Sequence, residues 1–92
     1  MSVYVDELRV WPHAKRPFKG GACHLTADTL DELHDLAKRI GMRREWFQGG
    51  SVPHYDLTPS MRAAAILAGV AFVPVKEQAR RRIAKREAGG VS

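Results

Sequence analysis

The sequence predicts a small single α/β domain, with a mixed or parallel sheet of three to four short strands and two to three helices packed on it. Two observations support this fold class. Short segments with period-two alternation of apolar and polar residues are typical of strands, and they alternate along the chain with segments that begin at helix caps. The predicted order is β-β-α-(β)-α-β-α, which favours helices packed on a sheet. A chain of 92 residues is sufficient for one such domain.

The first two strands are predicted at residues 2–6 and 22–27, where apolar and polar residues alternate. In the second strand, Cys23 falls on the apolar face and His24 on the polar face. Prolines, glycines and basic residues over residues 11–21 indicate a basic loop between the two strands.

Two helices are predicted from their caps. The first covers about residues 30–40, because Thr29 opens an S/T-x-x-E capping box and Gly41 stands where a left-handed C-cap is needed. The second begins after Thr58-Pro59, a hydroxyl N-cap followed by proline at the first helical position, and ends at Gly69.

Two more extended segments are predicted. Residues 53–57 alternate and form a short strand or extended segment, and residues 70–75 are rich in β-formers. Pro74 indicates that the second of these lies at the edge of the sheet. Before them, Trp46 and Phe47 are large apolar residues that we expect to pack.

The C-terminal segment, residues 76–92, is predicted to be a basic helix with a frayed tail that follows a compact domain over residues 1–75. Ala79 and Ile83 are the apolar anchors expected for this helix. The net charge of the chain is +5, and residues 76–87 hold six basic and two acidic side chains, a net of +4. The rest of the chain therefore contributes a net of +1, so the basic character belongs mainly to this segment.

Composition and spacing exclude several classes of protein. With Cys23 as the single cysteine, no internal disulfide forms, which fits a reducing compartment. The first residues lack the layout of a signal peptide, and the apolar stretch over residues 63–75 is too short to span a bilayer, so we expect a cytoplasmic protein without membrane contact. Neither Gly20-Gly21 nor Gly49-Gly50 has the context of a phosphate-binding fingerprint, so no nucleotide-cofactor motif is present.

Several segments together resemble one protein family. They are Val3-Tyr4-Val5-Asp6, Trp11-Pro12, Cys23-His24-Leu25 with Asp28, Asp31-Glu32-Leu33-His34, Gly41 through Arg44, Trp46-Phe47-Gln48-Gly49, Pro53-His54-Tyr55-Asp56-Leu57-Thr58, and Arg62 with the run to Gly69. Over about residues 3–75 the chain resembles the domain-of-unknown-function 4031 family of bacteria and phages. That family brings no established activity, cofactor or catalytic residue, so the resemblance implies a domain unit and no particular reaction.

The first candidate site consists of His24, His54 and Asp56, with Asp6 nearby in the strand pattern. His54 and Asp56 are two residues apart, so in an extended segment they point to the same side. Imidazole and carboxylate groups that converge can perform general acid–base catalysis or bind a divalent metal such as zinc or manganese. The alternative is purely structural: His and Asp hydrogen-bond each other and the backbone, and Asp56 helps to cap the following helix.

Two other side chains rank lower as site residues. His34 borders the apolar stripe of the first helix, where a half-buried polar contact is expected. Cys23 on an apolar face behaves as a small hydrophobe and is not expected to act as a nucleophile.

The second candidate site is cationic. Basic residues of the loop, interleaved with Trp11 and Phe18, and basic residues of the C-terminal helix suit phosphate groups and stacked bases. The alternative is a solvated basic surface without a ligand. The candidates for phosphate or nucleic-acid binding are Lys15, Arg16, Lys19, Arg62, Arg82, Lys85 and Arg86.

Three functions follow from these patterns. The first in rank is a module that binds nucleic acid or nucleotide phosphates through the basic loop and tail. The second is a small hydrolase or transferase acting on a phosphorylated or nucleotide substrate, with His24 or His54 as acid–base group, Asp56 as its orienting partner and Arg62 or the loop lysines as phosphate clamp. The third is a homodimeric protein-interaction module. Whether the chain is an enzyme, and whether it needs a metal, stays open at this level.

Overall fold

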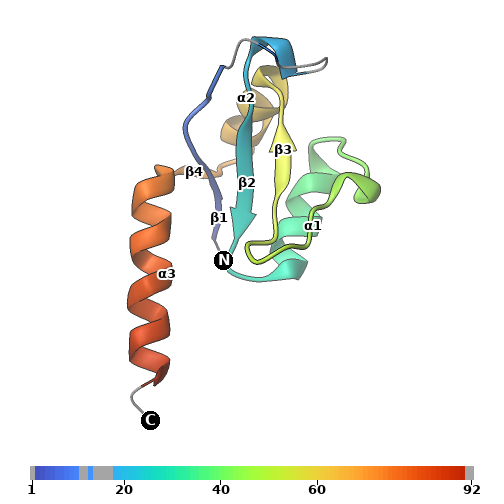
Figure 1. Cartoon of the computed structure of the whole chain (residues 1–92). Coiled ribbons are helices and arrows are strands. Elements are labelled where there is room, and N and C mark those ends of the chain that lie inside the picture. Colours follow the sequence, from blue (N-terminus) through green and yellow to red (C-terminus); the bar gives the residue numbers. More distant parts are fainter. Residues whose placement is uncertain (1, 11–12, 14–17, 91–92) are drawn as a thin grey trace.

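The computed structural model describes residues 2–10, 13 and 18–90, and for residues 19 and 85–90 it describes the backbone. It confirms a small α/β domain in which a four-stranded sheet is accompanied by three α-helices (Figure 1). The strands are β1 Val3–Val5, β2 Cys23–Ala27, β3 Tyr55–Leu57 and β4 Ala71–Phe72. The helices are α1 Leu30–Arg39, α2 Pro59–Leu67 and α3 Val75–Gly90, with 3-10 turns at Phe18–Gly20 and Arg44–Trp46.

The sheet is mixed, with strand order β3-β2-β1-β4. β1 pairs antiparallel with β2, and β2 antiparallel with β3, whereas β4 pairs parallel with β1. β4 is thus an edge strand, as Pro74 predicted, but it covers two residues instead of the expected 70–75 because α3 already begins at Val75. The pairing extends one step farther through the hydrogen bond from Val73 N to Val5 O (2.8 Å).

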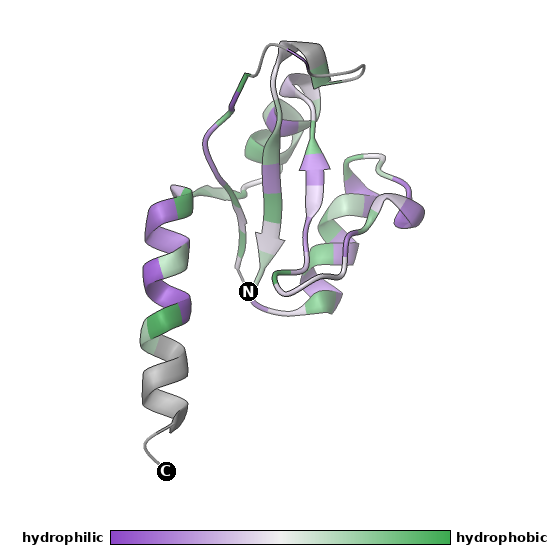
Figure 2. Ribbon diagram, viewed as in Figure 1, coloured by the Kyte–Doolittle hydropathy of each residue, from purple (hydrophilic) through white to green (hydrophobic). Residues whose placement is uncertain are grey.

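The apolar face of the sheet carries the core. Alternation places Val5, Leu25 and Leu57 on this face, each without exposed surface, against buried residues of α1 and α2 such as Leu33 and Ala65. Full burial of one such aliphatic side chain contributes about 1.5–3 kcal/mol to stability. Figure 2 shows hydrophilic and hydrophobic residues on the same strands, which is the pattern of a sheet with one face in the core.

The caps of α1 and α2 match the prediction closely. Thr29 Oγ1 accepts a hydrogen bond from Glu32 N (3.2 Å) and donates one to Glu32 Oε1 (2.9 Å), so the carboxylate meets the hydroxyl instead of the backbone N–H of a full capping box. Gly41 adopts a φ of 88°, the left-handed region expected at the end of α1. At α2, Thr58 Oγ1 accepts from Met61 N (3.3 Å) and Pro59 occupies the first turn.

The start of α3 is fastened to the sheet by polar groups. Gln78, 7% exposed, accepts a hydrogen bond from Thr26 Oγ1 (2.7 Å) and donates one to Val73 O (2.8 Å). Glu7 Oε1 accepts from Val75 N (2.7 Å), which satisfies a free N–H at the helix N-terminus. The expected apolar anchor Ile83 is 53% exposed, so the prediction of its role was wrong: a buried amide holds the helix.

The rest of α3 extends away from the sheet (Figure 1), and its coloured part, before residue 85, is largely hydrophilic (Figure 2). Its backbone continues to Gly90, beyond the expected fraying at Gly89, and residues 91–92 lie outside the described part of the chain. The expectation for Trp46 and Phe47 holds for Phe47, which packs against the core, whereas Trp46 is 43% exposed. Across the described residues, no helix has the length and apolarity needed to cross a membrane.

Candidate functional site

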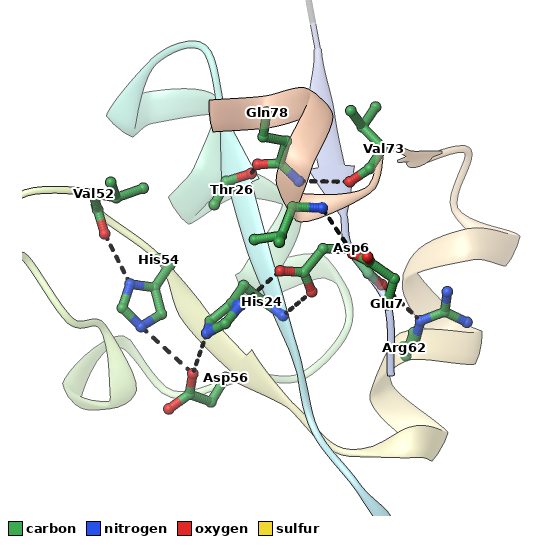
Figure 3. A network of polar contacts seen from close by, with 11 residues as sticks. Asp6, Glu7, His24, Thr26, Val52, His54, Asp56, Arg62, Val73 and Gln78 are labelled. Atoms are coloured by element: carbon green, nitrogen blue, oxygen red, sulfur yellow. Dashed lines mark hydrogen bonds and ion pairs between the residues drawn. The ribbon is translucent and has the colours of Figure 1, made fainter. Parts of the chain in front are cut away.

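The register of the sheet brings the first candidate residues together on the polar face. His24 of β2 and Asp56 of β3 are direct cross-strand partners. Their side chains point away from the core because their neighbours Cys23 and Tyr55 point into it. His54, two residues before Asp56, joins them, and its ring centroid lies 5.0 Å from that of His24 (Figure 3).

Asp6 holds the ring of His24. Its carboxylate lies 2.6 Å from His24 Nδ1 through Oδ2 and accepts a hydrogen bond from His24 N (2.7 Å) through Oδ1. Burial alone would raise the pKa of Asp6, but the hydrogen bonds from the His24 ring and backbone outweigh it and hold that pKa below its ordinary value. The same hydrogen bond raises the pKa of His24, against the opposing effect of burial.

A backbone carbonyl orients His54. Its Nδ1 lies 2.8 Å from Val52 O, and since a carbonyl only accepts, this nitrogen carries the proton. The backbone around His54 is fixed by reciprocal hydrogen bonds with Gln48, both of 2.9 Å. The other ring nitrogen, Nε2, therefore points away from Val52 and toward Asp56.

The carboxylate of Asp56 lies between the two rings. Oδ1 is 3.5 Å from His54 Nε2 and 3.9 Å from His24 Nε2. The other oxygen, Oδ2, accepts a hydrogen bond from the side-chain amide of Gln48. Each of the three groups therefore has a partner behind it, which leaves one atom of each free to face a common point.

Three possible ligand atoms converge at this point, namely Nε2 of His24, Nε2 of His54 and Oδ1 of Asp56. When each histidine carries a single proton, on Nδ1, the two Nε2 lone pairs and the carboxylate oxygen face one another, an arrangement that a cation between them stabilises. The ligand atoms of His24, His54 and Asp56 all lie within 4.8 Å of one another, so the three residues form a group that could hold one metal ion. The cation can be a metal ion or a shared proton.

His24 and His54 line a hollow of about 300 Å³ together with Asp6, Val52, Gln78 and Arg82. Asp56 lines the neighbouring hollow that also contains Gln48. The side chains of His24 and Asp56 are 45% and 34% exposed, and that of His54 is 22% exposed. A ligand from solvent therefore has access to the three converging atoms.

The cationic candidates are only partly placed. Arg62 serves the fold: its Nε donates to Asp6 O (3.3 Å), and its guanidinium lies 5.5 Å from the ring centroid of Phe72. Arg82 faces the hollow beside His24 and His54. Lys15 and Arg16 lie outside the described residues, as do the side chains of Lys19, Lys85 and Arg86.

Other side chains confirm or extend the sequence-based expectations. His34 lies on the core side of the sheet, where its Nδ1 is 2.8 Å from Tyr55 Oη, so it does not join His24 and His54. Gln48 and the carbonyl of Val52 were not predicted as site groups. The Gly49-Gly50 turn between two extended segments was the signal for a hairpin that brings Gln48 beside His54.

Comparison with known proteins gives a family and no activity. No curated protein and no solved structure matches the chain. A family model described as "Protein of unknown function (DUF4031)" matches residues 3–86, which extends the similarity beyond residue 75 and through most of α3. The chain therefore belongs to this protein family of unknown function.

Proposed function

We propose that the protein is a small metal-dependent hydrolase whose metal ion is bound by His24, His54 and Asp56. One observation carries the proposal: each of these side chains is oriented from behind, by Asp6, the Val52 carbonyl and the Gln48 amide respectively. Metal-binding histidines typically donate their second N–H to a carboxylate or carbonyl in this way. A purely structural His–Asp pair has no need of three such supports.

The chemistry follows from the number of ligands. Two imidazoles and one carboxylate are the donor set of several catalytic zinc sites, and they leave a coordination position for water. A metal ion lowers the pKa of bound water to about 7, which supplies hydroxide as a nucleophile at neutral pH. The hollow lined by His24 and His54 provides space for a substrate beside that position.

Metal binding is the first test. The purified full chain, freed of metal with a chelator and titrated with Zn²⁺ or Mn²⁺ by calorimetry, should bind one ion. Asp56→Asn should weaken binding by more than about 100-fold, and Gln48→Ala, which removes only the support of Asp56, by about 10-fold. The matched control is His34→Asn, a histidine on the other side of the sheet, which should bind like the wild type. Equal binding by Asp56→Asn and wild type would refute the site.

Hydrolysis is the second test. The metal-loaded chain should cleave 4-nitrophenyl phosphate or 4-nitrophenyl acetate, and EDTA or Asp56→Asn should abolish the activity. If turnover survives EDTA but is lost in His24→Gln, the reaction does not use a metal. The cation between the three residues would then be a shared proton, and the His24–Asp6 pair would act as a general acid–base. Metal binding with oxygen consumption in place of ester cleavage would indicate a non-haem iron centre, which uses the same donor set.

A further inference from the structure

We infer that the substrate is a small phosphate ester, with its phosphoryl group held between the metal position and Arg82 and its organic group in an adjoining hollow. The inference rests on the proposed function and adds the substrate class. Its reaction is hydrolysis, in which a P–O bond forms from water, the P–O bond to the alcohol breaks, and the alcohol leaves with a proton. The products are the free alcohol and inorganic phosphate.

The first support is the continuity of the groove. The hollow in front of His24 and His54 adjoins a second hollow of about 290 Å³. Both are lined by Thr26, Ser51, Val52, Gln78 and Arg82. A ligand that contacts His24 and His54 can therefore extend past Thr26 and Gln78 into the second hollow, toward the start of α1.

The second support is the position of Arg82. This residue is one helical turn after Gln78, so both lie on the face of α3 that is turned to the sheet. Gln78 fixes that face through its hydrogen bonds to Thr26 and Val73. Among the side chains that the structure describes, Glu77 forms ion pairs with Arg80 (3.3 Å) and Arg81 (3.4 Å), and no such pair engages Arg82. A planar guanidinium at the junction of the two hollows suits a phosphoryl group.

The third support is the character of the second hollow. Its walls include the apolar side chains of Leu30, Leu33 and Pro53. At one end, Tyr4 Oη donates a hydrogen bond to the carboxylate of Asp28 (3.1 Å), which leaves acceptor capacity on Asp28. Such walls suit a ring or short apolar group that carries a hydroxyl or amino donor.

Inorganic phosphate is the probe for the Arg82 subsite. Binding of phosphate to the full chain is measured by calorimetry with and without Zn²⁺. Arg82→Gln should weaken phosphate binding by about 10-fold and leave Zn²⁺ affinity unchanged. The matched control on the same helix is Arg80→Gln, whose guanidinium pairs with Glu77 and which should change phosphate binding less than about two-fold. Equal effects of the two variants, with or without metal, would overturn the subsite.

Kinetics separates this inference from the proposed function. Arg82→Gln should raise KM for 4-nitrophenyl phosphate and leave KM for the uncharged 4-nitrophenyl acetate unchanged. Leu30→Ser changes a half-exposed residue in the wall of the second hollow. It should raise KM for the aryl phosphate several-fold without weakening the binding of inorganic phosphate.

If metal-dependent cleavage persists but neither variant shows its effect, the substrate class is wrong and the hydrolase proposal stands. If Asp56→Asn leaves metal binding intact, the hydrolase proposal fails, and phosphate binding that requires Arg82 would still support the anion subsite.

Discussion

The two faces of the central sheet differ more than any other two regions of the molecule, although the same strands build both. On one face Leu25 and Tyr55 are at most 1% exposed, and on the other His24 and Asp56 are open to solvent. Because successive side chains of a strand alternate, the core and the candidate site use alternate residues of the same strands and share no contact surface. The comparison teaches that changes on one face should leave the other face intact, and the predictions below test this independence and the contacts that hold α3 beside the polar face.

The largest effect is expected on the apolar face. Leu25→Ala removes a side chain without exposed surface and should lower the free energy of unfolding by about 2–5 kcal/mol. Urea denaturation measures this loss, and metal affinity under conditions where the variant stays folded should equal that of the wild type. Asp56→Asn is the counterpart on the polar face: it is isosteric and partly exposed, and should change stability by less than about 1 kcal/mol. A comparable loss in both variants would contradict the separation of the faces.

A smaller effect is expected where α3 covers part of the polar face. Gln78→Ala leaves Thr26 Oγ1 and Val73 O without their partner in a buried place, which should cost about 1–3 kcal/mol. In this variant, amide hydrogen exchange in the first turns of α3 should be faster than in the wild type, and the increase should be larger there than in β2. The control is Gln48→Ala, an exposed amide on the same face of the sheet, which should leave the exchange of α3 unchanged. Exchange in α3 as slow as in the wild type would show that other contacts hold the helix.

Much of the fold was predictable because it depends on local patterns. Alternation identified the facing of Cys23 and His24, and caps identified α1 and α2. The anchor of α3 was not predictable from periodicity, since hydrophobic patterning indicated Ile83 whereas the buried contact is made by the amide of Gln78. A buried amide is recognised only when its two partners, which come from β2 and from the residue after β4, are placed around it.

The grouping of the candidate site residues was likewise predictable only as far as local patterns reach. His24, His54 and Asp56 were grouped by strand facing, but strand facing does not specify register, and a shift of one residue would have separated them. The supports behind them come from residues distant in the pattern: Asp6 lies beyond the end of β1, and Gln48 enters through a hairpin. Such groups depend on pairings between segments and carry no local signature.

A still smaller effect is expected at the junction of β1 and α3. The hydrogen bond from Val75 N holds the pKa of Glu7 below its ordinary value of 4.5. A carboxyl group whose pKa is lowered by folding stabilises the folded state above its unfolded pKa, and this contribution is lost as the pH falls through the folded value. The difference in stability between wild type and Glu7→Gln should therefore be constant above about pH 5 and vanish at lower pH. A difference that persists unchanged at pH 3 would contradict this role of Glu7.

The smallest effect is expected at Cys23, next to His24 in sequence but on the opposite face. Burial raises the pKa of this thiol to about 11, so at pH 8 only about one molecule in a thousand carries the reactive thiolate. Ellman's reagent should therefore produce almost no colour with the native chain and one equivalent after denaturation in urea. Because the thiol is 2% exposed and reacts when the core opens, saturating the site with Zn²⁺ should slow this reaction only by the factor by which the metal stabilises the folded state. Protection of Cys23 well beyond that factor would mean that binding on the polar face alters the core directly, so the two faces would be coupled through β2.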